Sequence, residues 1–240
     1  MGQAGGMDTE LAYAKLTLSL RLVGRRPDGY HLLDAEMVSV DLTDTLVFGP
    51  GRGLEVRGPF AVPTGADNLV ERALAAVGRT AAVRLDKHIP PGAGLGGGSA
   101  DAAAVLRWAG CADVAVAASL GADVAFCVDG GRARVSGVGE VIEPLPFMPG
   151  VAYTLLTPPF EVSTAAVYRT WDELGGPTAS GPNDLEPAAL ALDGRLAGWR
   201  DRLGEATGAE PVLAGSGSTW FVAGAFPEVG GAVVVRTAKP

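Results

Sequence analysis

Residues 90–101 read Pro90-Pro91-Gly92-Ala93-Gly94-Leu95-Gly96-Gly97-Gly98-Ser99-Ala100-Asp101, and a helix-forming run, residues 102–108, follows directly. Five glycines in seven residues allow positive φ angles and let backbone N–H groups approach an anion closely. The first turn of the following helix adds free N–H groups and the positive end of the helix dipole, and Ser99 is a candidate cap. The stretch therefore predicts a phosphate-binding loop.

Several classes of protein bind phosphate with a glycine-rich loop, and the flanking residues distinguish them. The glycines satisfy G-x-G-x-x-G, but Pro90-Pro91 interrupts the strand that a dinucleotide-binding fold places before its first glycine. A Walker A loop ends in Gly-Lys-Ser/Thr, whereas this loop has no lysine, and the His-Arg-Asp and Asp-Phe-Gly motifs of protein kinases do not occur in the sequence. A flexible linker is disfavoured because linkers seldom lead straight into an alanine-rich helix.

The pattern P-x-x-x-G-L-G-G-G-S-A-D-A-A resembles the phosphate loop of the GHMP small-molecule kinases. Two more segments narrow the resemblance: residues 14–33, which read A-K-L-T-L-S-L-R-L-V-G-R-R-P-D-G-Y-H-L-L, and residues 121–124, which read G-A-D-V. Over residues 11–224 the chain resembles the family of 4-diphosphocytidyl-2-C-methyl-D-erythritol (CDP-methylerythritol) kinases of the non-mevalonate isoprenoid pathway. The segment G-R-R-P-D-G-Y-H is the most specific part of this resemblance.

The overall composition limits the kinds of partner. The formal net charge of the 240 residues is −8 and no basic cluster exceeds Arg25-Arg26, so we expect binding to neither nucleic acid nor an anionic membrane. Cys111 and Cys127 are interpreted as buried thiols in a reducing compartment, not as a disulfide or a zinc site. With neither a signal peptide nor a membrane span evident, the expected protein is cytoplasmic, binds small molecules and is a monomer or weak homodimer.

Alternating polar and apolar residues predict strands over residues 11–23, with one solvent-facing side, and over residues 30–42, 46–48 and 83–89, followed by a hairpin over 133–142. The resemblance implies an α+β fold in two domains. Residues 1–148 would form an ATP-binding domain like domain 2 of ribosomal protein S5, with residues 1–9 as a disordered tail. Residues 149–240 would form a ferredoxin-like α/β sandwich.

Asp123 and Lys15 are the candidate catalytic residues. From the sequence pattern alone, Asp123 is equally suited to cap a helix or to act in catalysis. Lys15 is equally suited to act in the site or to be merely solvated on the polar face of a strand. The resemblance implies that Asp123 accepts the proton of the substrate's 2-hydroxyl and that Lys15 stabilises the developing charge. Ala125 stands where the family usually has proline, and the segment between the loop and Gly121 is shorter than in the family.

The resemblance also implies which residues bind ATP and its Mg²⁺. Asn68 would lie by the nucleotide, at the start of a helix that Asp67 caps, although capping alone is an equal alternative for Asn68. Lys87 or His88 would line the adenine pocket or lie on an exposed strand face. Ser99, the loop's only hydroxyl, is the candidate metal ligand. The loop residues expected at the ATP phosphates are Pro90, Pro91, Gly92, Ala93, Gly94, Leu95, Gly96, Gly97, Gly98, Ser99 and Ala100.

For the substrate, the resemblance implies that Tyr30 stacks on the cytosine and that His31 hydrogen-bonds its edge. Thr17 would contact substrate in place of the family's usual asparagine. The resemblance also places these residues near the substrate: Thr164, Tyr168, Gly215, Ser216 and Gly217. The alternatives for all the substrate candidates are ordinary packing, helix capping and a plain tight turn.

The expected reaction is ATP-dependent phosphorylation of the 2-hydroxyl of CDP-methylerythritol. Two other functions stay open at this point. A related GHMP kinase acting on homoserine, mevalonate or a sugar would share the loop but would have no use for Tyr30-His31. A nucleotide-binding module without catalysis would have no use for Lys15 and Asp123. Residues 183–186, Asn-Asp-Leu-Glu, are interpreted as a helix start with a structural role.

Overall fold

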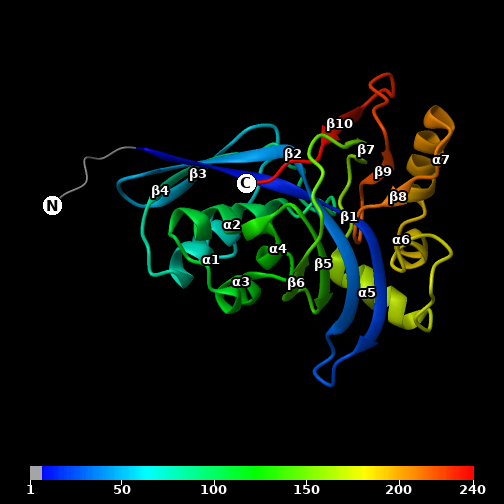
Figure 1. Ribbon diagram of the computed structural model, residues 1–240, viewed down its shortest axis with the longest axis horizontal. Helices are drawn as coiled ribbons and strands as arrows, with labels where there is room; N and C mark the ends of the chain where they lie inside the picture. The colour runs from blue at the N-terminus through cyan, green and yellow to red at the C-terminus, as the bar shows by residue number, and fades with distance from the viewer. Residues whose placement is uncertain (1–6) are drawn as a thin grey trace.

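The computed structural model describes residues 7–240, in which two β-sheets stand beside two groups of helices (Figure 1). The larger sheet has the order β3-β4-β2-β5-β6, and β1 pairs with β2 off this path. Only β3 and β4 pair in parallel. Its strands are β1 (Asp8–Arg25), β2 (His31–Gly49), β3 (Gly53–Arg57), β4 (Ala82–Asp86), β5 (Arg132–Gly137) and β6 (Val141–Pro144).

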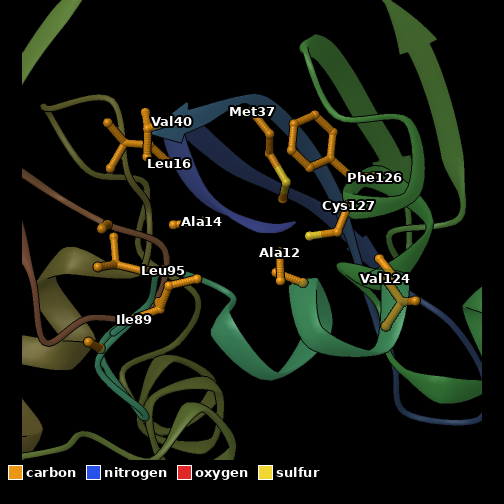
Figure 2. Packing of buried hydrophobic residues seen from close by; sticks show 14 of the residues in the cluster. Ala12, Ala14, Leu16, Met37, Val40, Ile89, Leu95, Val124, Phe126 and Cys127 are labelled. Carbon is orange, nitrogen blue, oxygen red and sulfur yellow. The ribbon is translucent and has the colours of Figure 1, made fainter. Parts of the chain in front are cut away.

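Four helices lie together against one face of this sheet (Figure 1). They are α1 (Leu69–Ala76), α2 (Gly97–Trp108), α3 (Val114–Leu120) and α4 (Val124–Asp129). The alanines at 102–104 of α2 are completely buried, because side chains this small let the helix approach β1 closely. Figure 2 shows Ala12 of β1 near Cys127 of α4, and Met37 of β2 beside Phe126 of α4. The alanine-rich run therefore places the N-terminus of α2 directly beside β1.

β1 and β2 form one long hairpin, and this corrects three expectations. Residues 43–45 continue β2, so the two predicted strands 30–42 and 46–48 are one. Asp8 and Thr9 pair with Phe48 and Val47, so these two residues belong to β1 and not to a tail; residues 1–6 of the predicted tail lie outside the described residues. The predicted solvent-facing side of residues 11–23 is covered at Lys15 and Thr17, which are both buried.

The second sheet has the order β10-β7-β9-β8 and is antiparallel throughout. In chain order this is 4-1-3-2, the arrangement of a ferredoxin-like sheet, but a turn over residues 224–231 stands where the second helix of that fold would lie. The larger and smaller sheets are joined by residues 145–151, where we propose the domain boundary. The part of the chain after this boundary contains β7 (Ala152–Leu156), α5 (Thr164–Glu173), α6 (Glu186–Leu192), α7 (Arg195–Thr207), β8 (Val212–Leu213), β9 (Trp220–Ala223) and β10 (Ala232–Arg236).

Backbone hydrogen bonds join the two halves of the chain at three places. Leu20 of β1 donates to Pro182 O (2.8 Å) and accepts from Asp184 N (2.9 Å). Thr219 N donates to Ala93 O in the phosphate loop (3.2 Å). After β10 the chain returns to the larger sheet, where Ala238 N donates to Ser39 O (3.0 Å). Among residues 7–240, no helix has the length and apolar character that crossing a membrane requires.

Candidate active site

A cavity of about 720 Å³ opens where the two halves meet. Both halves contribute to its walls, and most residues that the sequence pointed to line it together. These are Lys15, Thr17, Tyr30, His31, Asn68, Pro90, Pro91, Gly92, Ala93, Gly94, Gly96, Gly97, Gly98, Ser99, Asp123, Thr164, Tyr168, Gly215 and Ser216. Leu95, Ala100 and Gly217 do not line it: the side chains of Leu95 and Ala100 are buried in the core, and Gly217 packs beside Leu213.

The glycine loop ends in the first turn of α2. Gly96 is the N-cap and has a left-handed conformation (φ 68°), so Gly97, Gly98 and Ser99 form the first turn and leave N–H groups free at the cavity. Ser99 is therefore inside the helix and is not the predicted cap. The free N–H groups and the helix dipole favour a phosphate at this point.

Close packing holds the loop against β1 and against residues 214–217. Lys15 N donates to Leu95 O at 3.0 Å. A Cβ added to Gly96 would lie 2.7 Å from Cγ of Lys15, and one added to Gly94 would overlap the carbonyl oxygen of Ala214. Gly94 and Gly96 both have positive φ angles, 77° and 68°. Glycine is thus required at these two positions both by conformation and by space.

We expect Gly94→Ala to weaken ATP binding at least about 10-fold, because relief of the overlap moves the loop away from its phosphate-binding geometry. Titration with ATP under equilibrium conditions measures this. Gly110→Ala is the matched control, since Gly110 has φ 68° and open space around its Cβ position. Equal ATP affinities for the two variants would show that the approach to Ala214 has no role in shaping the loop.

Lys15 and Asp123 meet at the end of the loop. Lys15 Nζ lies 3.3 Å from Asp123 Oδ2 and donates to Thr17 Oγ1 at 3.0 Å. Asp123 occupies the N-cap position of α4 but makes no side-chain cap hydrogen bond there. Its carboxylate is 29% exposed toward the cavity, while the Lys15 side chain is 6% exposed. Of the two uses that the sequence left open for Asp123, the geometry favours contact with a substrate.

Asn68, not Asp67, is the N-cap of α1: its Oδ1 accepts from Val70 N at 2.8 Å. Asn68 also lines the cavity, so capping and a place by the nucleotide occur together at this residue. Of the two places considered for Lys87 and His88, Lys87 is buried and lines the cavity, whereas His88 is exposed and does not line it. Lys87 Nζ donates to Asp44 and to Asp101 Oδ2, the latter at 2.7 Å.

The Lys87 cluster, formed by Lys87, Asp44 and Asp101, lies directly beneath the loop. A Cβ added to Gly97 would be 2.9 Å from Lys87 Nζ. Asp44 also accepts from Ile89 N at 2.8 Å, which fixes the segment that enters Pro90-Pro91. Burial is the main cause that raises the pKa of Asp101 to about 7, and the charge of Asp44 adds to it while Lys87 opposes it.

A carboxyl pKa above its ordinary value makes stability fall as pH rises. The folded protein holds the Asp101 proton more tightly than the unfolded chain, so the contribution is full below about pH 4 and is lost as pH approaches 7. We expect the free energy of unfolding to fall by up to about 1.4 kcal/mol per pH unit in this window for one such proton. Urea unfolding from pH 4 to 8 measures it, and Asp101→Asn should flatten the slope. An identical slope in the variant would assign the pH dependence to other groups.

Tyr30, His31 and Tyr168 form the far end of the cavity, where the β1–β2 hairpin tip meets α5. Tyr30 is 64% exposed, and the His31 and Tyr168 rings lie 5.0 Å apart at 39°. Burial, with a smaller effect of the Asp123 charge, raises the pKa of Tyr168 to about 12, so its phenol stays protonated. The His31 ring is held from α5: Nε2 lies 2.8 Å from Asp172 Oδ1, and Trp171 meets the ring edge-on at 5.5 Å.

A second glycine-containing turn, residues 215–217, closes the cavity on the side of the smaller sheet. A Cβ at Gly215, which has φ 59°, would lie 3.2 Å from Lys15 Nζ. Ser216 Oγ and Thr164 Oγ1 are hydrogen-bonded at 2.8 Å, although Ser163 and not Thr164 caps α5. Asn183 donates to Gly215 O at 2.7 Å and to Leu213 O at 2.8 Å, which agrees with the structural role expected for residues 183–186.

Comparison with known proteins agrees with this arrangement. Residues 68–131 match the family model described as the GHMP kinases N terminal domain. The chain is 40% identical over 233 residues to the 4-diphosphocytidyl-2-C-methyl-D-erythritol kinase of Paracoccus denitrificans, an alignment that covers 88% of this chain and 85% of the relative. The chain belongs to the CDP-methylerythritol kinase family.

Solved structures support the fold of this CDP-methylerythritol kinase family member. A crystal structure of a 4-(cytidine 5'-diphospho)-2C-methyl-D-erythritol kinase superposes with a TM-score of 0.75 and 33% identity, covering 96% of this chain and 100% of that one. A homoserine kinase from Cytophaga hutchinsonii superposes with a TM-score of 0.62 at 19% identity, covering 100% and 97%, and shows the shared fold alone. The expected α+β GHMP kinase fold is confirmed.

Two groups at the cavity were not anticipated from the sequence. Asp172 contacts His31, and the only signal for it was its position four residues after Tyr168, which places both on the same face of α5. Asp44 and Asp101 both accept hydrogen bonds from Lys87, and no local pattern links these three residues. Both groups act on residues that were singled out, so their effect is on the geometry of the site.

Proposed function

We propose that the chain transfers the γ-phosphoryl group of ATP to the 2-hydroxyl of CDP-methylerythritol, giving the 2-phosphate and ADP in the non-mevalonate isoprenoid pathway. The Lys15–Asp123 pair, placed at the end of a phosphate loop, is the observation that carries the proposal. Phosphoryl transfer requires positioning and charge stabilisation more than covalent chemistry, and this cavity offers both.

In this mechanism, the N–H groups of the first turn of α2 hold the phosphates of ATP. Asp123 accepts the proton of the substrate hydroxyl as the new P–O bond forms, and ADP leaves with the electrons of the broken bond. Lys15 holds the Asp123 carboxylate in place through their 3.3 Å contact, and its ammonium stabilises the charge that develops on the transferred group. Thr17 orients the Lys15 ammonium through their 3.0 Å hydrogen bond.

The Tyr30, His31 and Tyr168 end of the cavity would take the cytosine ring. Aromatic faces suit a pyrimidine, and the imidazole supplies a polar contact to its edge. Thr164, Ser216 and the Gly215 turn would contact the rest of the substrate near Lys15.

Mg²⁺ would accompany ATP. Within residues 7–240, no three His, Cys, Asp or Glu side chains gather to hold a metal ion. The Ser99 hydroxyl lines the cavity and would complete a coordination shell made mostly of phosphate oxygens. When bound, the ion neutralises phosphate charge.

Release of ADP by the purified protein with Mg-ATP tests the proposal. CDP-methylerythritol should stimulate release, whereas homoserine and mevalonate should not. Stimulation by homoserine or mevalonate instead would assign the chain another substrate within the GHMP kinase fold. Bound ATP without stimulation by any of the three would indicate a nucleotide-binding protein without this activity.

A further inference from the structure

Asp172 lies outside the residues that the proposed mechanism uses, yet it is in direct contact with the His31 ring. Its Oδ1 is 2.8 Å from His31 Nε2, and its Oδ2 is 3.5 Å from Nη1 of Arg25 on the same hairpin. Asp172 is in the last turn of α5, where the helix dipole disfavours a carboxylate. An acid in this position therefore needs a stabilising partner, and Arg25 and His31 both provide one.

The contact fixes which nitrogen of His31 carries a proton. A carboxylate only accepts hydrogen bonds, so His31 Nε2 must be the donor in this pair. In the neutral imidazole, Nδ1 is then an acceptor. Within residues 7–240 Nδ1 has no hydrogen-bond partner, and it is not one of the atoms sealed from solvent. Since His31 lines the cavity, an acceptor is presented to whatever binds there.

This acceptor distinguishes between the two common pyrimidines. Cytosine has an amino group at C4, a donor, whereas uracil has a carbonyl oxygen there, an acceptor. An Nδ1 acceptor pairs with the amino group and repels the carbonyl. We propose that Asp172 is a positioning residue that sets the specificity for cytosine over uracil by holding His31 with its proton on Nε2. This inference rests on the proposed function, because it assigns the pyrimidine to the His31 end of the cavity.

The substitution Asp172→Asn exchanges the donor and acceptor nitrogens of His31 with little change in the shape of residue 172. Arg25 would attract the amide oxygen, which turns the NH₂ group toward His31. His31 Nε2 would then accept, and Nδ1–H would donate into the cavity. We expect the variant's preference for CDP-methylerythritol over its uridine analogue to narrow about 10- to 100-fold in kcat/KM, through KM and with kcat almost unchanged. Asp172→Glu keeps the carboxylate and should retain the preference.

The neighbouring Glu173, which is exposed and does not line the cavity, supplies the control Glu173→Gln. A second readout is independent of turnover: ¹⁵N spectra of histidine-labelled protein report the tautomer, and the chain has only two histidines to assign. We expect Nε2–H in the wild type and Nδ1–H in Asp172→Asn. The same tautomer in both, or an unchanged cytosine preference, would overturn the proposal.

Binding of CDP and UDP, measured by calorimetry, separates this inference from the proposed function. A wild-type protein that binds CDP more tightly than UDP, with the difference reduced in Asp172→Asn, supports the role of Asp172 even if CDP-methylerythritol is not phosphorylated. A wild-type protein that phosphorylates CDP-methylerythritol while Asp172→Asn keeps the full preference for CDP supports the proposed function and refutes the inference.

Discussion

Replacing Asp123 with asparagine is expected to lower kcat about 10²- to 10⁴-fold, the range usual for loss of a general base. The amide has nearly the shape of the carboxylate but cannot accept the hydroxyl proton. Because Asp123 is part-exposed at the cavity and makes no cap hydrogen bond in α4, the fold should tolerate the change. ATP affinity should change much less than kcat. Single-turnover measurements with saturating Mg-ATP and CDP-methylerythritol isolate the chemical step.

Asp129 provides a matched control at the other end of the same helix. It is exposed and does not line the cavity, so Asp129→Asn removes one charge from α4 without touching the site. We expect wild-type kcat from this control. Turnover by Asp123→Asn equal to that of the control would remove Asp123 from the mechanism.

Replacing Lys15 with methionine is expected to lower kcat about 10²- to 10³-fold, a loss comparable with removal of one donor that stabilises transition-state charge. Methionine is long enough to fill the space beside Gly96 and Gly215 but carries no charge. The Asp123 carboxylate keeps contact with solvent, so loss of its partner should not unfold the protein. Lys239→Met is the control, since Lys239 is exposed and outside the cavity.

The double variant, Lys15→Met with Asp123→Asn, tests whether the two residues act together. Residues that work as a unit show strongly non-additive losses, so the double variant should be little worse than the more damaged single variant. Losses that multiply instead would mean that Lys15 acts on the phosphates independently of Asp123.

The phosphate loop was predictable because its information is local. Closely spaced glycines followed by an alanine-rich helix indicate an anion site without knowledge of the rest of the chain. The pairing of Lys15 with Asp123 was different: each residue had an ordinary alternative by itself, and only the resemblance brought them together. The structure places them 3.3 Å apart.

The predictions of side-chain burial were wrong where a residue is covered by distant parts of the chain. Alternation over residues 11–23 correctly predicts a strand, but it cannot show that Gly96 and Gly215 cover the polar side chain of Lys15. For the same reason the sequence could not decide between the two places considered for Lys87, since Asp44 and Asp101, which bury its ammonium, come from other elements. The helix start at Asn68 instead of Asp67 is a one-residue uncertainty of the kind that cap-forming neighbours produce.

The hydrogen bonds that join the two halves also bear on motion during turnover. Leu20 is hydrogen-bonded to residues 182 and 184, Ala93 to Thr219, and Ser39 to Ala238. Backbone hydrogen bonds therefore cross between the two halves at three separated points. Rotation of one half about a single hinge would break hydrogen bonds at all three points, so these contacts oppose such a rotation. We therefore expect substrates to enter and products to leave through the open mouth of the cavity, aided by rotation of exposed side chains such as Tyr30, and not by a swing of one half away from the other.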